Sequence, residues 1–341
     1  MHKLFHILRL LLLVIIPVLL SLLVYSFMTR ALFEPVNPAD AKEVSVEISQ
    51  GMTFKDVCRL LKDKGIVRYA RGLDLMARLK GSPTDKIKAG EYMLSPAMSP
   101  AKVLAKLVSG EVLNRTVMLA PGISIHELSR IVADSGLLSK EEMENELVSG
   151  TLLARAGIAS NSFEGYLYPD TYFFSRPITA KDVIWKMLEE GETHWPKDFS
   201  DQADKLGMSR HEILTLASII EKETGRVSEQ PVISSVFHNR LKMGIKLQSD
   251  PTVIYGIQNF NGNITKEDLQ TPTPYNTYTN LGLPPGPICN PGESAVKAAL
   301  FPAETQFLYF VADGTGGHVF STTLAEHNEN VAKLVKGTVA N

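Results

Sequence analysis

The residue whose chemistry stands out is Glu221, a carboxylate on the apolar side of a predicted helix at 209–225. Ser209 and Glu212 form the Ser-x-x-Glu pattern of a capping box, and a glycine follows the helix. Burial raises the pKa of a carboxylate, and an acid that keeps its proton near neutral pH suits general-acid cleavage of a glycosidic bond. Helix geometry alone leaves an alternative, in which a buried arginine neutralises Glu221 or the residue lies at the rim of the core. The apolar arc that contains Glu221, at about 100° per residue, is made of Ile213, Leu214, Leu216, Ala217 and Ile220. The opposite arc is polar, with His211, Thr215, Ser218 and Lys222, and Glu223 points to another side of the helix than Glu221.

Other chemistries lack their motifs. His211-Glu212 has no second histidine at the spacing of a zinc-protease helix, and neither a Gly-x-Ser-x-Gly motif nor a phosphate-binding loop occurs. Cys58 and Cys289 are too far apart in the chain for a metal-binding pair. We therefore expect no metal and no cofactor. The net charge of -2 argues against nucleic acid as a partner.

The N-terminal segment predicts a membrane anchor. Leu10–Met28 is 19 residues without a charge, which is long enough to span a bilayer and longer than the apolar core of most signal peptides. We expect residues 1–9 in the cytoplasm, a transmembrane signal anchor at 10–29 and the rest of the chain outside, since Lys3 and Arg9 precede the span. A cleaved signal peptide is the alternative.

An internal repeat follows a tether predicted at 30–43. Residues 46–67 align with 117–138 at an offset of 71. Both copies predict a strand, a glycine turn, a hydroxyl N-cap with an acid three residues on, and an amphipathic helix. Each module needs a neighbouring strand such as 90–95 to complete it. The alternative to a functional module is that the repeat is only structural scaffold.

The remaining chain predicts a mixed α+β domain at 139–335 with a short tail at 336–341. Its segment Phe163–Phe174 interleaves aromatic rings with Glu164 and Asp170, which suits a sugar-binding wall or a half-buried strand. Helices are predicted at 229–243 and 293–300, a hairpin at 307–312 with 318–321, and polar, proline-rich loops lie between them. Loops of that composition are often functional.

Several of these segments together resemble the YceG-like endolytic murein transglycosylases (the MltG family). The resemblance covers most of 164–328 in the family's order, and the anchor and repeat extend it to nearly the whole chain. The matching segments are Glu-Gly-Tyr-Leu-Tyr-Pro-Asp-Thr-Tyr (164–172), Ala-Ser-Ile-Ile-Glu-Lys-Glu-Thr (217–224), Leu-Gln-Ser-Asp-Pro-Thr-Val-Ile-Tyr-Gly (247–256), Tyr-Asn-Thr-Tyr (275–278), Gly-Leu-Pro-Pro-Gly-Pro-Ile (282–288), Tyr-Phe-Val-Ala-Asp-Gly (309–314) and Gly-Gly-His (316–318).

The resemblance implies a bacterial inner-membrane enzyme with LysM-like modules at 44–138 and a periplasmic YceG-like catalytic domain at 139–335. It implies that Glu221 is the family's essential glutamate, which cuts between N-acetylmuramic acid and N-acetylglucosamine and leaves a 1,6-anhydro end. Peptidoglycan glycan strands, the membrane and peptidoglycan synthases are the implied partners, and the role is to end glycan elongation. The residues expected to hold the glycan are Gln248, Asp250, Tyr275, Asn276 and Asn290, followed by Glu164 and Asp170.

Two other functions remain open from the sequence. The chain is a non-catalytic glycan-binding scaffold in one of them. In the other it is a glycoside hydrolase that uses Asp250 or Glu164 as the second carboxylate that hydrolysis requires.

Overall fold

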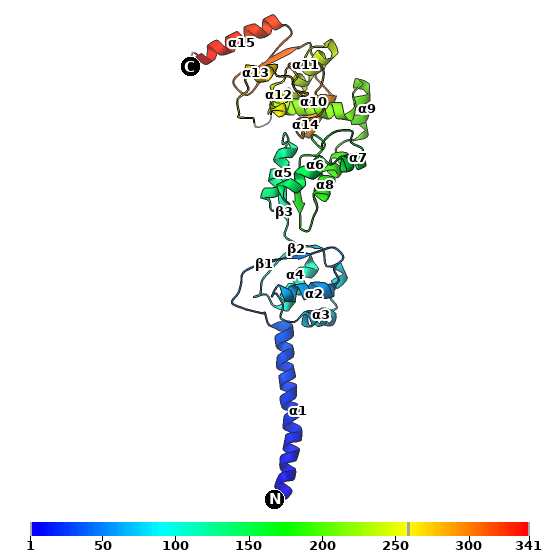
Figure 1. The fold of residues 1–341 in the computed structure, drawn as a ribbon, viewed down its shortest axis with the longest axis vertical. Coiled ribbons are helices and arrows are strands. Elements are labelled where there is room, and N and C mark those ends of the chain that lie inside the picture. Colours follow the sequence, from blue (N-terminus) through cyan, green and yellow to red (C-terminus); the bar gives the residue numbers. More distant parts are fainter. Residues whose placement is uncertain (1, 258–259, 340–341) are drawn as a thin grey trace. The chain divides into compact units, whose positions relative to one another are not determined.

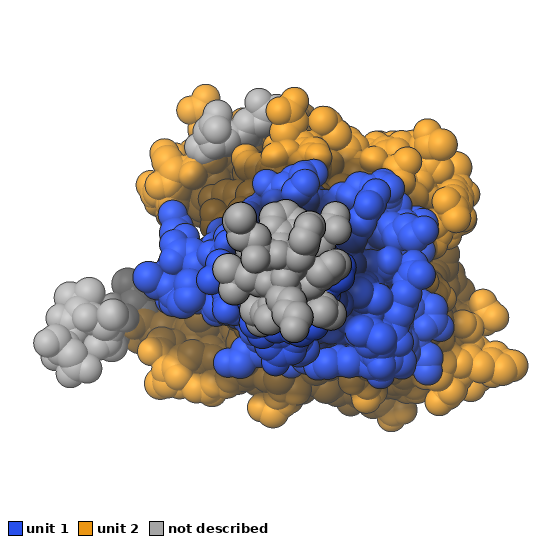
Figure 2. Space-filling view, turned by 90° about the horizontal axis from the view of Figure 1, so that it is seen from below, with its two compact units in different colours: residues 1–115, 174–177 blue, residues 116–173, 178–341 orange. Residues whose placement is uncertain are grey.

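The computed structural model describes residues 2–257 and 260–339, so Met1 and the end of the predicted tail, 340–341, lie outside the described residues. The fold is mixed α+β, as predicted. The chain forms two compact units, coloured separately in Figure 2: unit 1 contains 1–115 with 174–177, and unit 2 contains 116–173 with 178–341. Each unit has its own core of buried apolar side chains.

The first helix, α1 (His2–Phe33), carries the predicted anchor (Figure 1). Its segment Leu12–Arg30 is apolar and long enough to cross a bilayer, and none of that segment is buried in the protein. The helix continues to Phe33, beyond the predicted end at residue 29. Pro17 lies inside the helix, as transmembrane helices tolerate.

Unit 1 packs three helices on one two-stranded sheet. Strand β1 (Val44–Ile48) pairs antiparallel with β2 (Gly90–Leu94), with Val46 opposite Tyr92 and both fully buried. This confirms that the segment near 90–95 completes the first repeat copy. The other elements of the unit are α2 (Phe54–Asp63), α3 (Ala70–Leu79), the short 3-10 helix η1 (Thr84–Lys86) and α4 (Pro100–Ser109).

The repeat is confirmed in its local geometry. Capping boxes start α2 at Thr53 and α5 (Ile125–Asp134) at Ser124, and the glycine turns have φ of 85° at Gly51 and 83° at Gly122. The second copy pairs with a different strand. Its strand β3 (Arg115–Met118) pairs with β4 (Thr171–Phe174), and most of β3 belongs to unit 2. The likeness of the modules to LysM and the boundary at 138 stay predictions.

Unit 2 surrounds a central helix, α10 (Arg210–Glu223), with other helices and a hairpin. The predicted hairpin is confirmed: β5 (Tyr309–Ala312) pairs antiparallel with β6 (His318–Ser321). Both helices predicted after the central one are also confirmed. The helices of the unit after α5 are α6 (Lys140–Leu147), α7 (Gly150–Arg155), α8 (Ala180–Thr193), α9 (Lys197–Leu206), α10 (Arg210–Glu223), η2 (Val227–Glu229), α11 (Gln230–Met243), α12 (Asp250–Gly256), α13 (Lys266–Gln270), α14 (Glu293–Leu300) and α15 (Leu324–Val339).

The central helix, α10, differs from its prediction in one respect. Residues 213–220 are all buried, so the face expected to be polar, with Thr215 and Ser218, is also inside. Local hydrogen bonds make this possible: Thr215 Oγ1 donates to His211 O at 2.7 Å, and Ser218 Oγ donates to Thr215 O at 2.7 Å and accepts from Ile288 N at 3.0 Å. The capping box at Ser209 is confirmed, but the helix ends at Glu223 in extended backbone rather than in a glycine turn.

This burial predicts the effect of a cavity in α10. Leu216 is fully buried, and Leu216→Ala should lower the free energy of unfolding by about 2–5 kcal/mol. Leu281, which is 65% exposed, supplies the control, since Leu281→Ala should change it by less than about 0.5 kcal/mol. Denaturant unfolding of the full chain in detergent measures both. Equal effects of the two variants would contradict the central placement of α10.

Candidate active site

Glu221 lies in the last turn of α10, half-buried beside two backbone segments. Gly292 N, at the start of α14, donates a hydrogen bond to Glu221 Oε2 at 3.1 Å. On another side is Gly122, where an added Cβ would lie 3.7 Å from Glu221 Cγ. Residues from three distant stretches of sequence therefore meet at this carboxyl.

Burial raises the pKa of Glu221 above its ordinary value, while the Gly292 N–H and the Lys222 charge oppose that rise. Lys222 Nζ itself donates to Gly122 O at 3.3 Å. Within the part of the chain that the structure describes, Glu221 forms no ion pair with an arginine or lysine. The carboxyl thus keeps its proton to a higher pH than an ordinary glutamate does, and it remains partly accessible to solvent. Both properties suit a general acid.

Asn290 fastens the segments around Glu221 to one another. It is fully buried, and its backbone exchanges hydrogen bonds with Ile123 O at 3.0 Å and Gly122 N at 2.9 Å. Its Oδ1 accepts from Gly165 N and Leu167 N, both at 3.0 Å, and its Nδ2 donates to Ile123 O at 3.0 Å. Every polar atom of this amide is used, so Asn290 fixes the loop at 122–123 next to Glu221.

Glu164 is another carboxyl that contacts Asn290, and it is buried, with 2% of its surface exposed. It accepts hydrogen bonds from Ile125 N at 3.1 and 3.2 Å, from Tyr255 Oη at 3.2 Å and from Asn290 Nδ2 at 3.4 Å. Burial raises the pKa of Glu164 to about 8, against the hydrogen bonds from Ile125 and Tyr255. The residue connects the N-terminus of α5 to α12 beneath the surface.

Glu223 leaves the same turn of α10 toward a different set of residues. Ser249 Oγ donates to Glu223 Oε1 at 2.5 Å. Burial raises the pKa of Glu223 to about 7, and the charge of Asp250 adds to that rise, while the Ser249 hydrogen bond, His318 and Arg240 oppose it. The last turn of α10 therefore carries two carboxyls with raised pKa values, in separate environments.

Two of the predicted glycan-binding residues lie on the Glu223 side. Asp250 is exposed at the start of α12 and accepts from Tyr278 Oη at 2.6 Å. Gln248 is exposed with φ of 53°, a left-handed backbone that non-glycine residues rarely adopt. Its Oε1 lies 3.4 Å from Arg240 Nη1, which also donates to Leu247 O at 2.7 Å.

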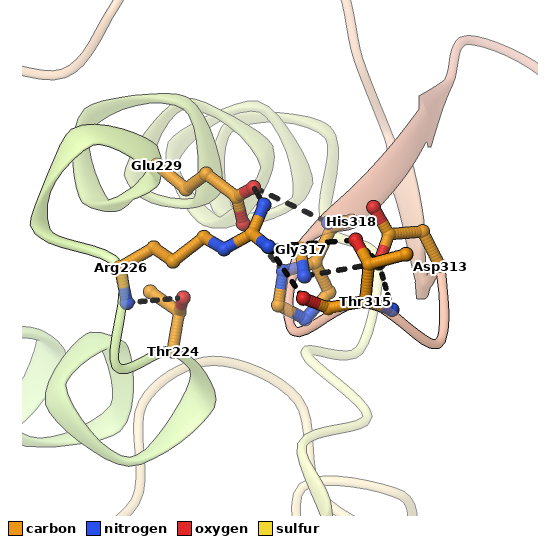
Figure 3. Close-up of polar contacts among 7 residues, drawn as sticks. All are labelled: Thr224, Arg226, Glu229, Asp313, Thr315, Gly317 and His318. Carbon is orange, nitrogen blue, oxygen red and sulfur yellow. Dashed lines mark hydrogen bonds and ion pairs between the residues drawn. The ribbon is translucent and has the colours of Figure 1, made fainter.

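The hairpin tip is pinned to the connection between α10 and α11 (Figure 3). Glu229 Oε2 pairs with His318 Nδ1 at 2.7 Å, and Arg226 Nη2 donates to Thr315 O at 2.5 Å. A Cβ on Gly317 would lie 2.3 Å from Arg226 Nη1, so a larger residue at this position would displace the Arg226 side chain. The pairing holds His318 where its charge acts on Glu223.

The other predicted site residues have varied positions. Tyr275 is half-buried, with its ring 4.8 Å from that of Tyr255, which in turn donates to Glu164. Asn276 is fully buried and donates to the carbonyls of residues 268, 269 and 271. Asp170 is exposed before β4, and its carboxyl accepts from its own neighbour, Thr171 N, at 2.6 Å.

Sequence reasoning missed several residues that shape the site. The Ser249 contact with Glu223 and the Tyr255 contact with Glu164 join segments 26 and 91 residues apart. No local pattern reports such contacts. The sequence does carry one signal, because two glutamates, Glu221 and Glu223, lie at the end of the predicted helix on different sides of it.

Comparisons with known proteins agree on one family. The model of the YceG-like family matches residues 46–333. An endolytic murein transglycosylase of Bacillus subtilis is 31% identical over 321 residues, covering 90% of this chain and 89% of that protein. One from Streptococcus pneumoniae is 28% identical over 91% of this chain, which spans only 62% of that longer protein.

A solved structure supports the same assignment. The crystal structure of a YceG-like protein from Listeria monocytogenes is 34% identical to this chain and superposes with a TM-score of 0.59. The match covers 84% of this chain and 98% of the Listeria protein. The likeness therefore extends beyond the site to most of the fold.

The raised pKa of Glu164 predicts a pH dependence of stability. The folded protein keeps this proton up to about pH 8, whereas the unfolded chain releases it near 4.5. Between these values the folded state binds more protons, so Glu164 makes the free energy of unfolding fall as pH rises, by at most about 1.4 kcal/mol per pH unit. Glu164→Gln cannot titrate and should make the slope shallower, while Glu223, whose pKa is also raised, keeps its own contribution.

Denaturant unfolding from roughly pH 5 to 8 measures the effect. Glu212→Gln is the control, because capping by Ser209 lowers the pKa of Glu212 and glutamine can also complete the capping box. An unchanged slope in Glu164→Gln would contradict a buried, protonated Glu164.

Proposed function

Because the chain belongs to the YceG-like family, we propose that it is a peptidoglycan lytic transglycosylase in which Glu221 is the general acid and then the general base. The observation that carries this proposal is the state of Glu221. Its carboxyl is half-buried, has a raised pKa and forms no ion pair with the described residues. The names of the Bacillus and Streptococcus relatives supply the substrate class.

One carboxyl is sufficient for the proposed chemistry. Glu221 donates its proton to the glycosidic oxygen between N-acetylmuramic acid and N-acetylglucosamine, and the bond from the muramic C1 to that oxygen breaks. The 6-hydroxyl of the same muramic residue then attacks C1 of the oxocarbenium-like species and returns its proton to Glu221. Water takes no part, because a tethered hydroxyl has a high effective concentration. Hydrolysis would need a second carboxylate to activate water or to attack C1.

The buried candidates suit a positioning role better than direct binding. Asn276 and Asn290 are fully buried, Glu164 nearly so, and their hydrogen bonds go to other parts of the protein. We propose that these three hold the loops around Glu221. The half-buried ring of Tyr275 and the exposed Gln248 and Asp250 remain the proposed glycan contacts.

Asp170 has a weaker basis than the other proposed glycan contacts. Its carboxyl bonds the following backbone N–H, so a glycan contact at this residue rests on the sequence alone.

The proposed setting is the bacterial inner membrane. The apolar helix α1 would anchor the chain with residues 1–9 in the cytoplasm and the catalytic domain in the periplasm, since Lys3 and Arg9 precede the span. Cutting would then fall on nascent glycan strands close to the membrane. A partnership with peptidoglycan synthases and an end to glycan elongation follow from the family resemblance.

The test is digestion of purified sacculi. Glu221→Gln should lower release of 1,6-anhydro muropeptides by roughly a thousandfold, since it removes the proton donor, while Glu212→Gln in the same helix should keep wild-type activity. Undiminished release by Glu221→Gln would sink the assigned role. No release by the wild-type chain would favour a scaffold, and products carrying an added water would identify a hydrolase, with Asp250→Asn and Glu164→Gln then locating its second carboxylate.

The rate should also depend on pH with a defined sign. Glu221 must be protonated to start the reaction, so turnover should fall as pH rises through the pKa of Glu221, which burial places above the ordinary value for glutamate. Steady-state release from sacculi across neutral pH measures this. Turnover that rises with pH throughout that range would show that an ionised group starts the reaction.

A further inference from the structure

A cationic groove of about 820 Å³ lies between α2 and α3 in unit 1. Five cations line it: Lys55, Arg59, Lys62, Arg71 and Arg78. This set of side chains is called the α2–α3 groove below. We propose that the α2–α3 groove binds the phosphate headgroups of anionic phospholipids in the membrane that α1 crosses.

The groove keeps an excess of positive charge after its internal pairs are counted. Arg59 pairs with Asp56 at 2.8 Å, and Arg78 pairs with Asp74 at 2.9 Å. The remaining cations, Lys55, Lys62 and Arg71, form no ion pair with any residue that the structure describes. One further carboxylate, Asp63, also lines the groove, so five cations face three carboxylates and the groove keeps a net positive charge. Three exposed cations on one concave surface suit a ligand with several negative charges, because phosphate oxygens accept hydrogen bonds from ammonium and guanidinium groups.

The groove is held at the membrane end of its unit. Tyr69 lines it, and the Tyr69 ring lies 5.3 Å from that of Phe27, inside the apolar segment Leu12–Arg30. Leu32, just past that segment, is buried in the core of unit 1, and Arg68 Nη2 donates to Val36 O at 3.1 Å. Figure 1 shows α3 beside the end of α1. The end of the groove at Tyr69 and Arg71 therefore lies near headgroup level when α1 spans the bilayer.

The outer face of α3 adds an apolar part to the same surface. Leu73, Met76 and Ala77 face the core, whereas Leu75 is 40% exposed and Leu79 is 72% exposed. At about 100° per residue these two leucines share the exposed arc with Arg71 and Arg78. A helix with leucines and arginines on its free face is typical of the bilayer interface, where apolar side chains enter the acyl boundary and cations meet lipid phosphates.

A bilayer is the occupant that accounts for both parts of this surface. A soluble anion would use the cations and leave Leu75 and Leu79 in water, while the membrane supplies phosphates and an apolar boundary at the same depth. The inference rests on α1 crossing the membrane, which is part of the proposed setting, and does not depend on the role of Glu221. Loss of lipid binding and loss of sacculus digestion are therefore separate outcomes.

Hydrogen exchange of the full chain in nanodiscs tests the inference. Nanodiscs of phosphatidylcholine alone are compared with nanodiscs that also contain anionic phosphatidylglycerol. Backbone exchange in peptides covering 69–80 should slow by about fivefold or more in the anionic discs, since each cation near an anionic surface contributes about that factor. High salt should remove the difference, because it screens charges at the bilayer surface.

Two double variants distinguish an effect of the groove cations from an effect of the protein's net charge. Lys62→Glu with Arg71→Glu should abolish the lipid-dependent slowing, whereas Lys102→Glu with Lys181→Glu, which changes the net charge equally on exposed helix positions outside the groove, should retain it. Equal exchange in both lipid mixtures, or equal behaviour of the two variant pairs, would overturn the proposal. Slowing that appears only when purified glycan strands are added would also overturn it and would identify a glycan site.

Discussion

The hydrogen bond from Gly292 N to Glu221 Oε2 is the contact on which the geometry of the site depends. It fixes the direction of the carboxyl. Without this contact, the half-buried carboxyl would turn toward water to regain its hydration. The residue at 292 is suited to that approach, because a Cβ there would lie 3.2 Å from the Pro121 ring and 3.4 Å from Glu221 Oε2. A backbone donor supplies orientation with only a partial charge, so the raised pKa survives.

The buried helix α10 and the buried Asn290 hold that contact in place. Helix α10 is buried on all sides from 213 to 220, so its last turn is placed by the core rather than by surface interactions. Asn290 then ties the 122–123 loop and the 164–167 turn to the segment that carries Gly292. A fully bonded buried amide of this kind specifies one arrangement, since any displacement leaves polar atoms without partners.

The sequence predicted the local features of this fold well and the distant contacts poorly. The capping boxes at Thr53, Ser124 and Ser209 and the hairpin at β5–β6 depend on residues close in the chain, and all were found. The buried hydroxyl face of α10 was missed, because serine and threonine can satisfy their hydroxyls on the preceding turn and then pass as core residues.

The same distinction applies to the candidate site. Glu221 could be singled out because its position relative to its helix neighbours is a local property. The division of the loop residues between the Glu221 and Glu223 sides of α10 could not be predicted, since it depends on contacts between segments tens of residues apart, such as Ser249 with Glu223 and Glu164 with Asn290.

The proposed chemistry depends on Glu221 holding its proton at a pH where an ordinary glutamate is ionised. Carbon-13 NMR of protein labelled at the glutamate side-chain carboxyls measures this directly, with the Glu221 signal assigned by its absence in Glu221→Gln. We expect a titration midpoint above the ordinary value of 4.5, because burial raises the pKa of Glu221. A midpoint at or below 4.5 would rule out Glu221 as a carboxyl with a raised pKa.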